Sequence, residues 1–195
     1  MEGKYSLHKD GGLIAGAVPG DIIHRFEKTP TSIFHNEYEG ATYLVEKIIA
    51  KIKEYEQSHP LNENGHTAEP FVLGLSTGSS PVGVYRELVK RHKNGEVSFR
   101  NVKVFSIDEF YPITAADCQS RNYSIHSEFL NHIDIKPENI QLPDGTIPME
   151  QISDYCAEFD KSIRKIDLMI LGVGEQGQIG FNEPGSYAKS RTRLV

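Results

Sequence analysis

The sequence predicts an α/β protein with an open, Rossmann-like parallel sheet that has helices on both faces, in three layers. Short apolar segments at 71–76, 102–107 and 166–171 have the length and composition of buried strands. Longer segments with helical periodicity alternate with these strands along the chain. This alternation is typical of βαβ units, whose parallel sheet is covered by helices on its two faces.

The first helix is expected to begin after Asn36, whose side chain can cap its first turn. Its apolar residues recur at helical spacing: Tyr38, Ala41, Leu44, Val45, Ile48, Ile49 and Ile52. The next helix is expected over 81–95, directly after the strand at 71–76. Pro81 stands at its first position and Gly95 just past its end, which is the usual placement of these two residues.

Two further helices, at 121–133 and 149–165, complete the alternation with the later strands. The second has an apolar stripe of Ile152, Cys156, Phe159 and Ile163. We assign residues 36–195 to one α/β domain. Residues 1–35 are interpreted as an N-terminal extension with a short ordered piece at 21–29.

The composition is that of a globular protein and argues against several classes of function. The formal net charge is −6 without a block of basic residues, so nucleic acid is not the expected partner. No apolar run approaches about 18 residues, so no segment is expected to span a membrane. Neither Cys118 nor Cys156 has metal-ligand spacing, and idle thiols are typical of a reducing compartment. We therefore expect a cytoplasmic protein without a metal.

In an open α/β sheet, ligands bind beyond the carboxyl ends of the strands, and three unusual loops are expected there. The first loop precedes a helix and consists of Ser76, Thr77, Gly78, Ser79 and Ser80. Its hydroxyls and backbone N–H groups, together with the positive end of the helix, could form a phosphate site. The alternative is an ordinary helix start with Ser80 as the N-cap, and these residues alone do not decide between the two.

The second loop carries two adjacent carboxylates, Asp108 and Glu109, at the end of a strand. Because neighbouring residues in an extended chain point to opposite sides, one should face the cleft and the other the helix layer. A partly desolvated carboxylate at this edge is a candidate general base. The alternative is a strand-end turn with two solvated acids.

The third loop, at 171–186, reads LGVGEQGQIGFNEPGS and contains the pattern GxGxxG at 172–177. This pattern indicates a dinucleotide site only where a helix begins within it, and Gly180, Pro184 and Gly185 would break such a helix. We interpret the glycines as a loop that lets the backbone approach a ligand closely. The loop also places four polar side chains at the sheet edge, those of Gln176, Gln178, Asn182 and Glu183.

Together these loops resemble one family, the glucosamine-6-phosphate deaminases, also called isomerases. The resemblance covers about residues 36–195 and rests on the segments 71–99, 106–111, 120–145 and 171–193. The wider superfamily also contains 6-phosphogluconolactonases and ribose-5-phosphate isomerases, which share the sheet and the phosphate loop. The segments RNYSIHSEF and FNEP favour the deaminases.

The resemblance implies that glucosamine 6-phosphate and water become fructose 6-phosphate and ammonia, without a metal or organic cofactor. A carboxylate moves a proton between C2 and C1, and the family's aspartate for this step matches Asp108. The glutamate of FNEP, which orients a histidine in the family, matches Glu183. Ser186 and Arg193 match part of the effector site of allosteric members. The implied substrate contacts are Ser76, Thr77, Gly78, Ser79, Ser80, Asp108, Gly174 and Asn182.

Three features depart from the family's pattern. The family's loop usually reads GxDGHIxFNEP, whereas this chain has Gln176 at the aspartate position and Gln178 at the histidine position. That histidine is thought to assist ring opening, and glutamine can form hydrogen bonds but cannot titrate. Val195 replaces an effector-site lysine. Because the family's domain runs on beyond this point, we expect a domain truncated at its C-terminus, a fragment of a longer chain.

Three functions therefore remain, each with a small-molecule sugar phosphate as partner. The first is a deaminase/isomerase whose catalytic candidates are Asp108, Glu183, Gln178 and Gln176. The second is a non-catalytic regulatory module that binds sugar phosphates, motivated by the two glutamines. The third is a hydrolase like 6-phosphogluconolactonase, ranked last because the loop offers no histidine to activate water. A homo-oligomer is expected.

Overall fold

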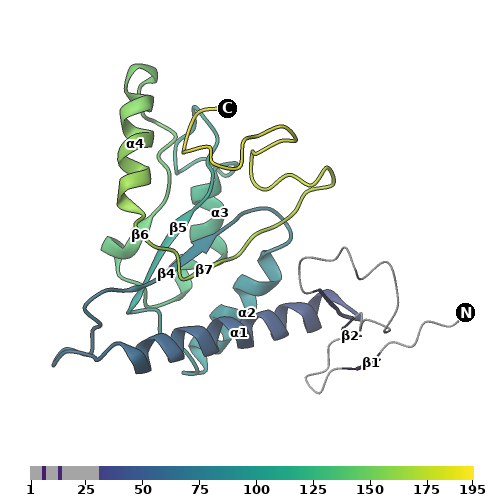
Figure 1. Ribbon diagram of the computed structural model, residues 1–195. Helices are drawn as coiled ribbons and strands as arrows, with labels where there is room; N and C mark the ends of the chain where they lie inside the picture. Colours follow the sequence, from purple (N-terminus) through teal and green to yellow (C-terminus); the bar gives the residue numbers. More distant parts are fainter. Residues whose placement is uncertain (1–5, 8–12, 15–30) are drawn as a thin grey trace, which may run out of the picture.

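The computed structural model describes residues 6–7, 13–14 and 31–195, and there it confirms the predicted α/β architecture. The central sheet has the strand order β6-β5-β4-β7 (Figure 1), and its ladders are all parallel. The strands are β4 (Phe71–Leu75), β5 (Val102–Ser106), β6 (Ile140–Gln141) and β7 (Leu168–Met169). In the longest ladder, Phe71 of β4 lies opposite Val102 of β5 and Leu75 lies opposite Ser106.

Helices connect these strands. The α-helices in the described residues are α1 (Glu37–Ser58), α2 (Val82–Lys93), α3 (Arg121–Glu128) and α4 (Ile152–Ser162). Short 3-10 turns are η2 (Leu130–His132), η3 (Pro137–Asn139) and η4 (Met149–Gln151). Before α1, a small antiparallel sheet contains β1 (Ser6–Leu7), β2 (Leu13–Ile14) and β3 (Ser32–Ile33). The ordered piece predicted at 21–29 lies outside the described residues.

The start of α1 agrees with the prediction. Asn36 is its N-cap, and the Asn36 side-chain oxygen accepts a hydrogen bond from the Glu39 N–H at 2.9 Å. Tyr38 and Leu44 of the predicted stripe are nevertheless 63% and 39% exposed. A helix that covers one face of a sheet buries only a stripe of its surface, and these two side chains lie outside that stripe. The buried members are Ala41, Val45, Ile48, Ile49 and Ile52.

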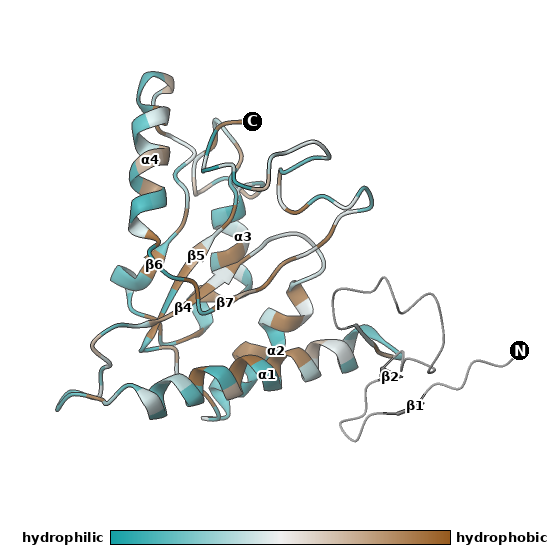
Figure 2. Ribbon diagram, viewed as in Figure 1, coloured by the Kyte–Doolittle hydropathy of each residue, from teal (hydrophilic) through white to brown (hydrophobic). Residues whose placement is uncertain are grey.

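One hydrophobic core fills the space between the sheet and helices α1, α2 and α3. Leu73 of β4 and Val104 of β5 are fully buried in it, as are Ile48 of α1 and Leu88 of α2. Figure 2 shows hydrophobic residues gathered in the strands and on parts of α1 and α2. Because these helices hold β4 and β5 in place, they also fix where the loops after the two strands begin.

The opposite face of the sheet meets the end of α4. Val72 and Phe105 alternate with the core residues of their strands, and they line a cavity together with Ser162 and Ile163. Helices therefore lie on both faces, as predicted. Of the predicted α4 stripe only Phe159 is buried, because α4 meets the sheet through its C-terminal end; the partly exposed members are Ile152, Cys156 and Ile163.

Two predicted helices are shorter than their periodicity indicated. The helix expected over 121–133 ends as α3 at Glu128, and Phe129 leaves helical geometry with a φ of −140°. Its buried ring packs on Tyr85 and Phe99, and this packing directs the chain away from the helix axis. The helix expected over 149–165 begins as η4 and ends at Ser162.

The later strands also differ from the prediction. The strand expected over 166–171 forms a ladder only at Leu168 and Met169, because β7 lies at the edge of the sheet and pairs with β4 alone. Strand β6, which pairs with β5, was not predicted. Its two residues are too few for a recognisable alternation of apolar and polar side chains.

The strand order creates a switch point between β4 and β7. From β4 the chain builds outward through β5 to β6, and it then returns to place β7 on the other side of β4. In open α/β sheets, ligands bind at such a point, beyond the carboxyl ends of the strands. The loops after β4 and β7 flank this point directly.

Candidate active site

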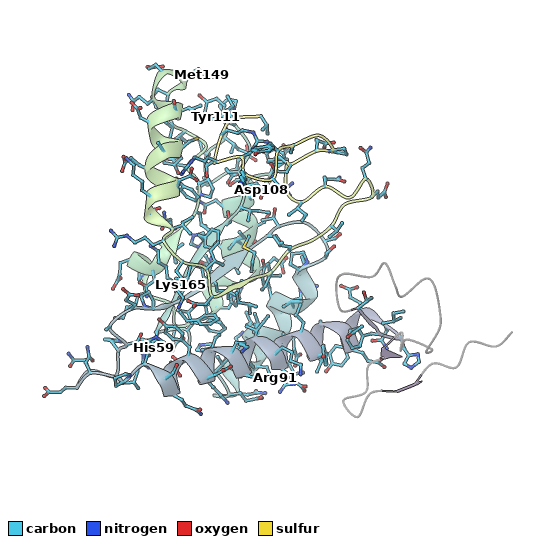
Figure 3. The ribbon with its side chains drawn as sticks, in the orientation of Figure 1. His59, Arg91, Asp108, Tyr111, Met149 and Lys165 are labelled. Atoms are coloured by element: carbon cyan, nitrogen blue, oxygen red, sulfur yellow. The ribbon has the colours of Figure 1, made fainter. Side chains whose placement is uncertain are left out.

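The loops after β4, β5 and β7 meet at the carboxyl edge of the sheet. A Cβ atom on Gly172 would lie 3.8 Å from the Ser80 Cβ, so the first and third loops are adjacent. A Cβ atom on Gly180 would lie 3.2 Å from Oδ2 of Asp108, so the second and third loops are adjacent too. Figure 3 shows Asp108 at this edge, beside the C-terminal segment. The structure thus brings together all three loops that the sequence indicated.

The loop after β4 leads into α2 without a side-chain cap. Pro81 is the N-cap residue, and no side chain of the described residues caps the first turn. The prediction of Pro81 as the first helical residue is therefore off by one position, and the alternative with Ser80 as N-cap is wrong. Gly78 has a φ of +97°, a conformation that favours glycine. The exposed loop and the uncapped N–H groups form a suitable place for an anion.

The base of this loop is fixed by Tyr85 of α2. The buried Tyr85 hydroxyl donates to the Ser76 carbonyl and accepts from the Ser76 N–H, the latter at 3.2 Å. Burial is the main cause that raises the Tyr85 pKa well above its usual range. Ser76 is only 3% exposed, and its hydroxyl has no hydrogen-bond partner among the described residues. Thr77 is half-buried, and positions 78–80 are exposed.

Asp108 is half-buried where β5 ends. Its Oδ1 atom is buried and has no hydrogen-bond partner within the described part of the chain. Burial raises the pKa of the Asp108 carboxyl, with a smaller contribution in the same direction from Glu109, while Arg121 and a hydrogen bond from Thr77 oppose this rise. A carboxylate with a raised pKa at the carboxyl edge of the sheet has the properties of a general base.

Glu109 points to the helix layer, as the alternation of side chains predicts. Its two carboxylate oxygens accept hydrogen bonds from the Ser120 hydroxyl at 2.7 Å and from the N–H groups of Arg121 and Asn122, each at 2.8 Å. It also accepts from the N–H of Phe110 at 2.8 Å. Glu109 therefore holds the N-terminus of α3 against the end of β5, and it is not a solvated acid.

Sequence reasoning missed Arg121 as a site residue. Its guanidinium lies 4.6 Å from the ring centre of Phe110 and 5.6 Å from that of Phe181. An arginine at the start of a helix carries no signal of such a contact, because the two rings come from loops 71 residues apart. Only the packing of these loops brings them together.

The third loop folds back on itself. The Gln178 side chain accepts a hydrogen bond from the Gln176 N–H at 3.0 Å and lies directly against Gly174. The Gln178 carbonyl accepts from the Gly174 N–H at 2.9 Å. The Gln176 side chain is exposed. No helix begins within 172–185 in the structure, which agrees with the rejection of a dinucleotide-binding turn.

The remaining predicted residues lie on the exposed C-terminal segment. Asn182 accepts a hydrogen bond from the Arg193 guanidinium at 3.1 Å, and the Ser186 N–H donates to the Glu183 carbonyl at 3.0 Å. The Glu183 side chain is exposed. Thr192 donates to Asp160 of α4 through both its N–H and its hydroxyl, which fastens this segment to the helix.

Comparison with known proteins identifies the family. The family described as glucosamine-6-phosphate isomerases/6-phosphogluconolactonase matches residues 36–180. The chain belongs to this family. A glucosamine-6-phosphate isomerase of Candida albicans is 41% identical over 167 residues, which cover 84% of this chain and 62% of that protein. A glucosamine-6-phosphate deaminase of Treponema denticola is 42% identical over 165 residues, which cover 83% of this chain and 57% of that protein.

A solved structure of a glucosamine-6-phosphate deaminase has the same fold. It is that of a monomeric glucosamine-6-phosphate deaminase, 30% identical, with a TM-score of 0.72 over 82% of this chain and 61% of that chain. The chain thus spans about three fifths of the length of these relatives. In the described part of the chain, no helix has the length and apolar character needed to cross a membrane. No three His, Cys, Asp or Glu side chains of the described residues are grouped so as to hold a metal.

Proposed function

We propose that this protein converts glucosamine 6-phosphate and water into fructose 6-phosphate and ammonia, with Asp108 as the proton-transferring group. The observation that carries this proposal is the position of Asp108. A half-buried carboxylate with a raised pKa stands at the carboxyl edge of the sheet, next to the switch point and to an uncapped helix N-terminus. The relatives named above support glucosamine 6-phosphate as the substrate.

The proton transfer requires the open-chain sugar. The Asp108 carboxylate takes the proton from C2, and the electron pair of that bond forms a C1–C2 double bond. The C1 carbonyl oxygen becomes a hydroxyl by taking a proton from the C2 ammonium group. Asp108 then returns the proton to C1, which leaves an imine at C2. Water adds to this imine and ammonia departs, so that a ketone remains. A raised pKa suits Asp108 to both steps, because it must accept a proton and then release it.

The phosphate is proposed to bind at the loop before α2. Thr77, Gly78, Ser79 and Ser80 offer hydroxyls and N–H groups there, and the uncapped N-terminus of α2 adds the positive end of its dipole. Because Gly172 lies against Ser80, a phosphate at this loop would direct the sugar toward the third loop and Asp108. Gly174 and Asn182 are the proposed contacts on that side.

This chain has no proton-transferring side chain at the position from which the family's histidine assists ring opening. Gln178 occupies the position of the family's histidine, and its side chain is bonded to its own loop at the Gln176 N–H. Glutamine cannot take up and return a proton. We therefore propose that the enzyme depends on spontaneous opening of the sugar and that Gln176, Gln178 and Glu183 shape the loop.

Ammonia release from glucosamine 6-phosphate tests the proposal. In Asp108→Asn, release should fall by about 10²–10⁴-fold, the usual contribution of a general base. Asp154→Asn is the matched control, since Asp154 is exposed on α4, and it should keep the wild-type rate. If Asp108→Asn releases ammonia at the rate of the wild type, the proposed role of Asp108 is wrong.

The second candidate is a regulatory module that binds sugar phosphates without turnover. Gln178 favours this candidate in two ways. Its side chain cannot titrate at the histidine position, and it is already hydrogen-bonded to its own loop at the Gln176 N–H. Calorimetry would then show binding of glucosamine 6-phosphate while the same protein releases no ammonia. A gain of ammonia release in Gln178→His would support the idea that a catalytic function has lapsed. Wild-type turnover equal to that of a histidine-bearing relative would exclude this candidate.

Three expectations from the sequence stay predictions. They are an effector site at Ser186 and Arg193, a homo-oligomeric assembly and a cytoplasmic location. The Arg193 guanidinium already binds Asn182, so an effector at Arg193 would have to compete with this contact or extend it. Size measurement in solution tests the assembly.

A further inference from the structure

The Arg121 guanidinium packs against two neighbouring aromatic rings at the edge of the proposed active site. Phe110 and Phe181 lie 5.2 Å apart between ring centres, and the guanidinium carbon is within 5.6 Å of both centres. Such distances are those of cation–π contacts. Phe110 follows the Asp108 loop, and Phe181 lies in the third loop. Arg121 thus connects the two loops between which the substrate is proposed to bind.

The placement of Arg121 depends on the neighbour of Asp108. Arg121 is the first residue of α3, and its N–H donates to Glu109 at 2.8 Å. Glu109 precedes Phe110 directly, so one short segment supplies the general base, the anchor of α3 and one of the two rings. This arrangement gives the guanidinium a fixed position relative to the Asp108 carboxylate.

The groups around Asp108 differ in whether they favour or oppose ionisation of its carboxyl. The negative charge of Glu109 acts against ionisation of Asp108, and Asp108 in turn raises the pKa of the buried Tyr85 hydroxyl. Burial of Asp108 acts in the same direction, and Thr77 supplies a neutral hydrogen bond. Arg121 is the cation that opposes these effects among the described residues.

Within residues 31–195, the Arg121 side chain forms no ion pair closer than the contacts described above. Its Nε atom is buried and has no hydrogen-bond partner in residues 31–195. The positive charge is therefore held in place by the two rings and by the helix start. Packing against aromatic rings suits arginine better than lysine, whose charge is a point at the end of a flexible chain.

We propose that Arg121 is a positioning residue for Asp108: its guanidinium, packed against Phe110 and Phe181, keeps the half-buried carboxylate ionised and joins the Asp108 loop to the Phe181 loop. This inference rests on the proposed function, in which Asp108 must be ionised to accept the C2 proton. The role differs from a catalytic one, because Arg121 acts through Asp108 and its buried Nε is not offered to the substrate.

The experiment follows the Asp108 carboxyl itself by NMR of protein with carbon-13 in the aspartate carboxyls. The carboxyl signal of Asp108 is identified as the one that is missing from the spectrum of Asp108→Asn. In Arg121→Gln the titration midpoint should move to higher pH by about one pH unit, since a neighbouring guanidinium typically lowers an aspartate pKa by one unit or more. Arg121→Lys should move it less, because the charge remains. Phe181→Leu, a milder change, should move it in the same direction.

Arg86→Gln is the matched control. It removes the same charge from the surface of α2, where Arg86 is paired with Glu128 at 3.2 Å and its side chain is 69% exposed. The Asp108 titration and the rate should both stay as in the wild type. Circular dichroism shows whether each variant is folded. If Arg121→Gln is not folded, the Asp108 titration midpoint in Phe181→Leu tests the inference instead.

Ammonia release provides the second measurement. In Arg121→Gln the acid limb of the kcat/KM profile should move to higher pH together with the NMR midpoint, while the rate at alkaline pH stays within about threefold of wild type. An unchanged midpoint in a folded Arg121→Gln protein, or an equal loss of rate at all pH values, overturns the inference. If the wild type releases no ammonia, the proposed function is wrong, and the NMR midpoint still decides whether Arg121 keeps Asp108 ionised.

Discussion

Glu109 offers a sharp test of how the site is held together. Replacement of Glu109 by alanine removes an acceptor of four hydrogen bonds. Two of the donors are backbone N–H groups at the start of α3, those of Arg121 and Asn122. The others are the Ser120 hydroxyl and the Phe110 N–H. The N–H groups of α3 have no partner within their own helix, so the loss of Glu109 leaves them dependent on water.

The size of the effect follows from these contacts. A hydrogen bond to a charged group contributes about 1.5–3 kcal/mol, and a carboxylate at a helix N-terminus adds about 0.3–1 kcal/mol. The four bonds share one half-buried carboxylate and are not additive, because water reaches part of the vacated space. We therefore expect Glu109→Ala to lower the free energy of unfolding by about 3 kcal/mol. For a chain of this size, that corresponds to a fall in Tm of about 6–12 °C.

Urea unfolding followed by circular dichroism measures this loss, and Glu109→Gln should lose about half as much because one acceptor oxygen remains. Glu128→Ala is the control. Glu128 makes an exposed ion pair with Arg86, and such pairs contribute about 0–1 kcal/mol. If Glu109→Ala is no less stable than Glu128→Ala, Glu109 does not anchor α3, and the fixed position inferred for Arg121 loses its basis.

Three further predictions concern the same edge and the sheet below it. Asp108→Asn should raise the free energy of unfolding near neutral pH, because a raised pKa means that the fold prefers the protonated carboxyl. The gain should shrink as pH falls through the folded-state pKa and vanish below the ordinary aspartate value, as thermal melts from about pH 3 to about pH 8 would show. Gly180→Ala should reduce ammonia release about tenfold or more, since the new Cβ would lie 3.2 Å from Asp108 Oδ2 at a φ of +58°. Gly65→Ala is its control, with a φ of +76° and open space around the Cβ, and it should share the strain and keep the activity. Gly74→Ala should destabilise the sheet by about 1–3 kcal/mol in urea unfolding, because its Cβ would collide with the Met169 sulfur and lie 2.8 Å from the Phe105 ring; a stability equal to wild type would mean that both side chains move aside freely.

The fold was largely readable from the sequence, and the failures have a common cause. The start of helix α1 and the bounds of strands β4 and β5 were predicted nearly to the residue, because their apolar residues recur with the period of one element facing one core. The early end of α3 and the short β7 were not, because packing partners decide them. Phe129 leaves the helix to pack on Tyr85, and β7 is limited by its single neighbour.

For the candidate site too, the sequence predicted some features and missed those that depend on packing. The sequence indicated the three loops, because small residues and carboxylates that directly follow apolar strands can be recognised from the order of the amino acids. It also indicated that Asp108 and Glu109 point to opposite sides. It could not assign Glu109 to the start of α3 or place Arg121 against the rings of Phe110 and Phe181, since these contacts join residues 11 to 60 positions apart.

The sequence by itself determined which residue types stand at the carboxyl edge of the sheet, including the glutamine at position 178, which cannot carry a proton. That follows from side-chain chemistry alone. Only the tertiary structure decided that Asp108, and not Glu109, is the carboxylate with a buried oxygen left without a partner among the described residues, and that Arg121 is the cation acting on it. Burial and electrostatic interaction depend on distances in space, and the loops acquire those distances only when the helices have packed on the sheet.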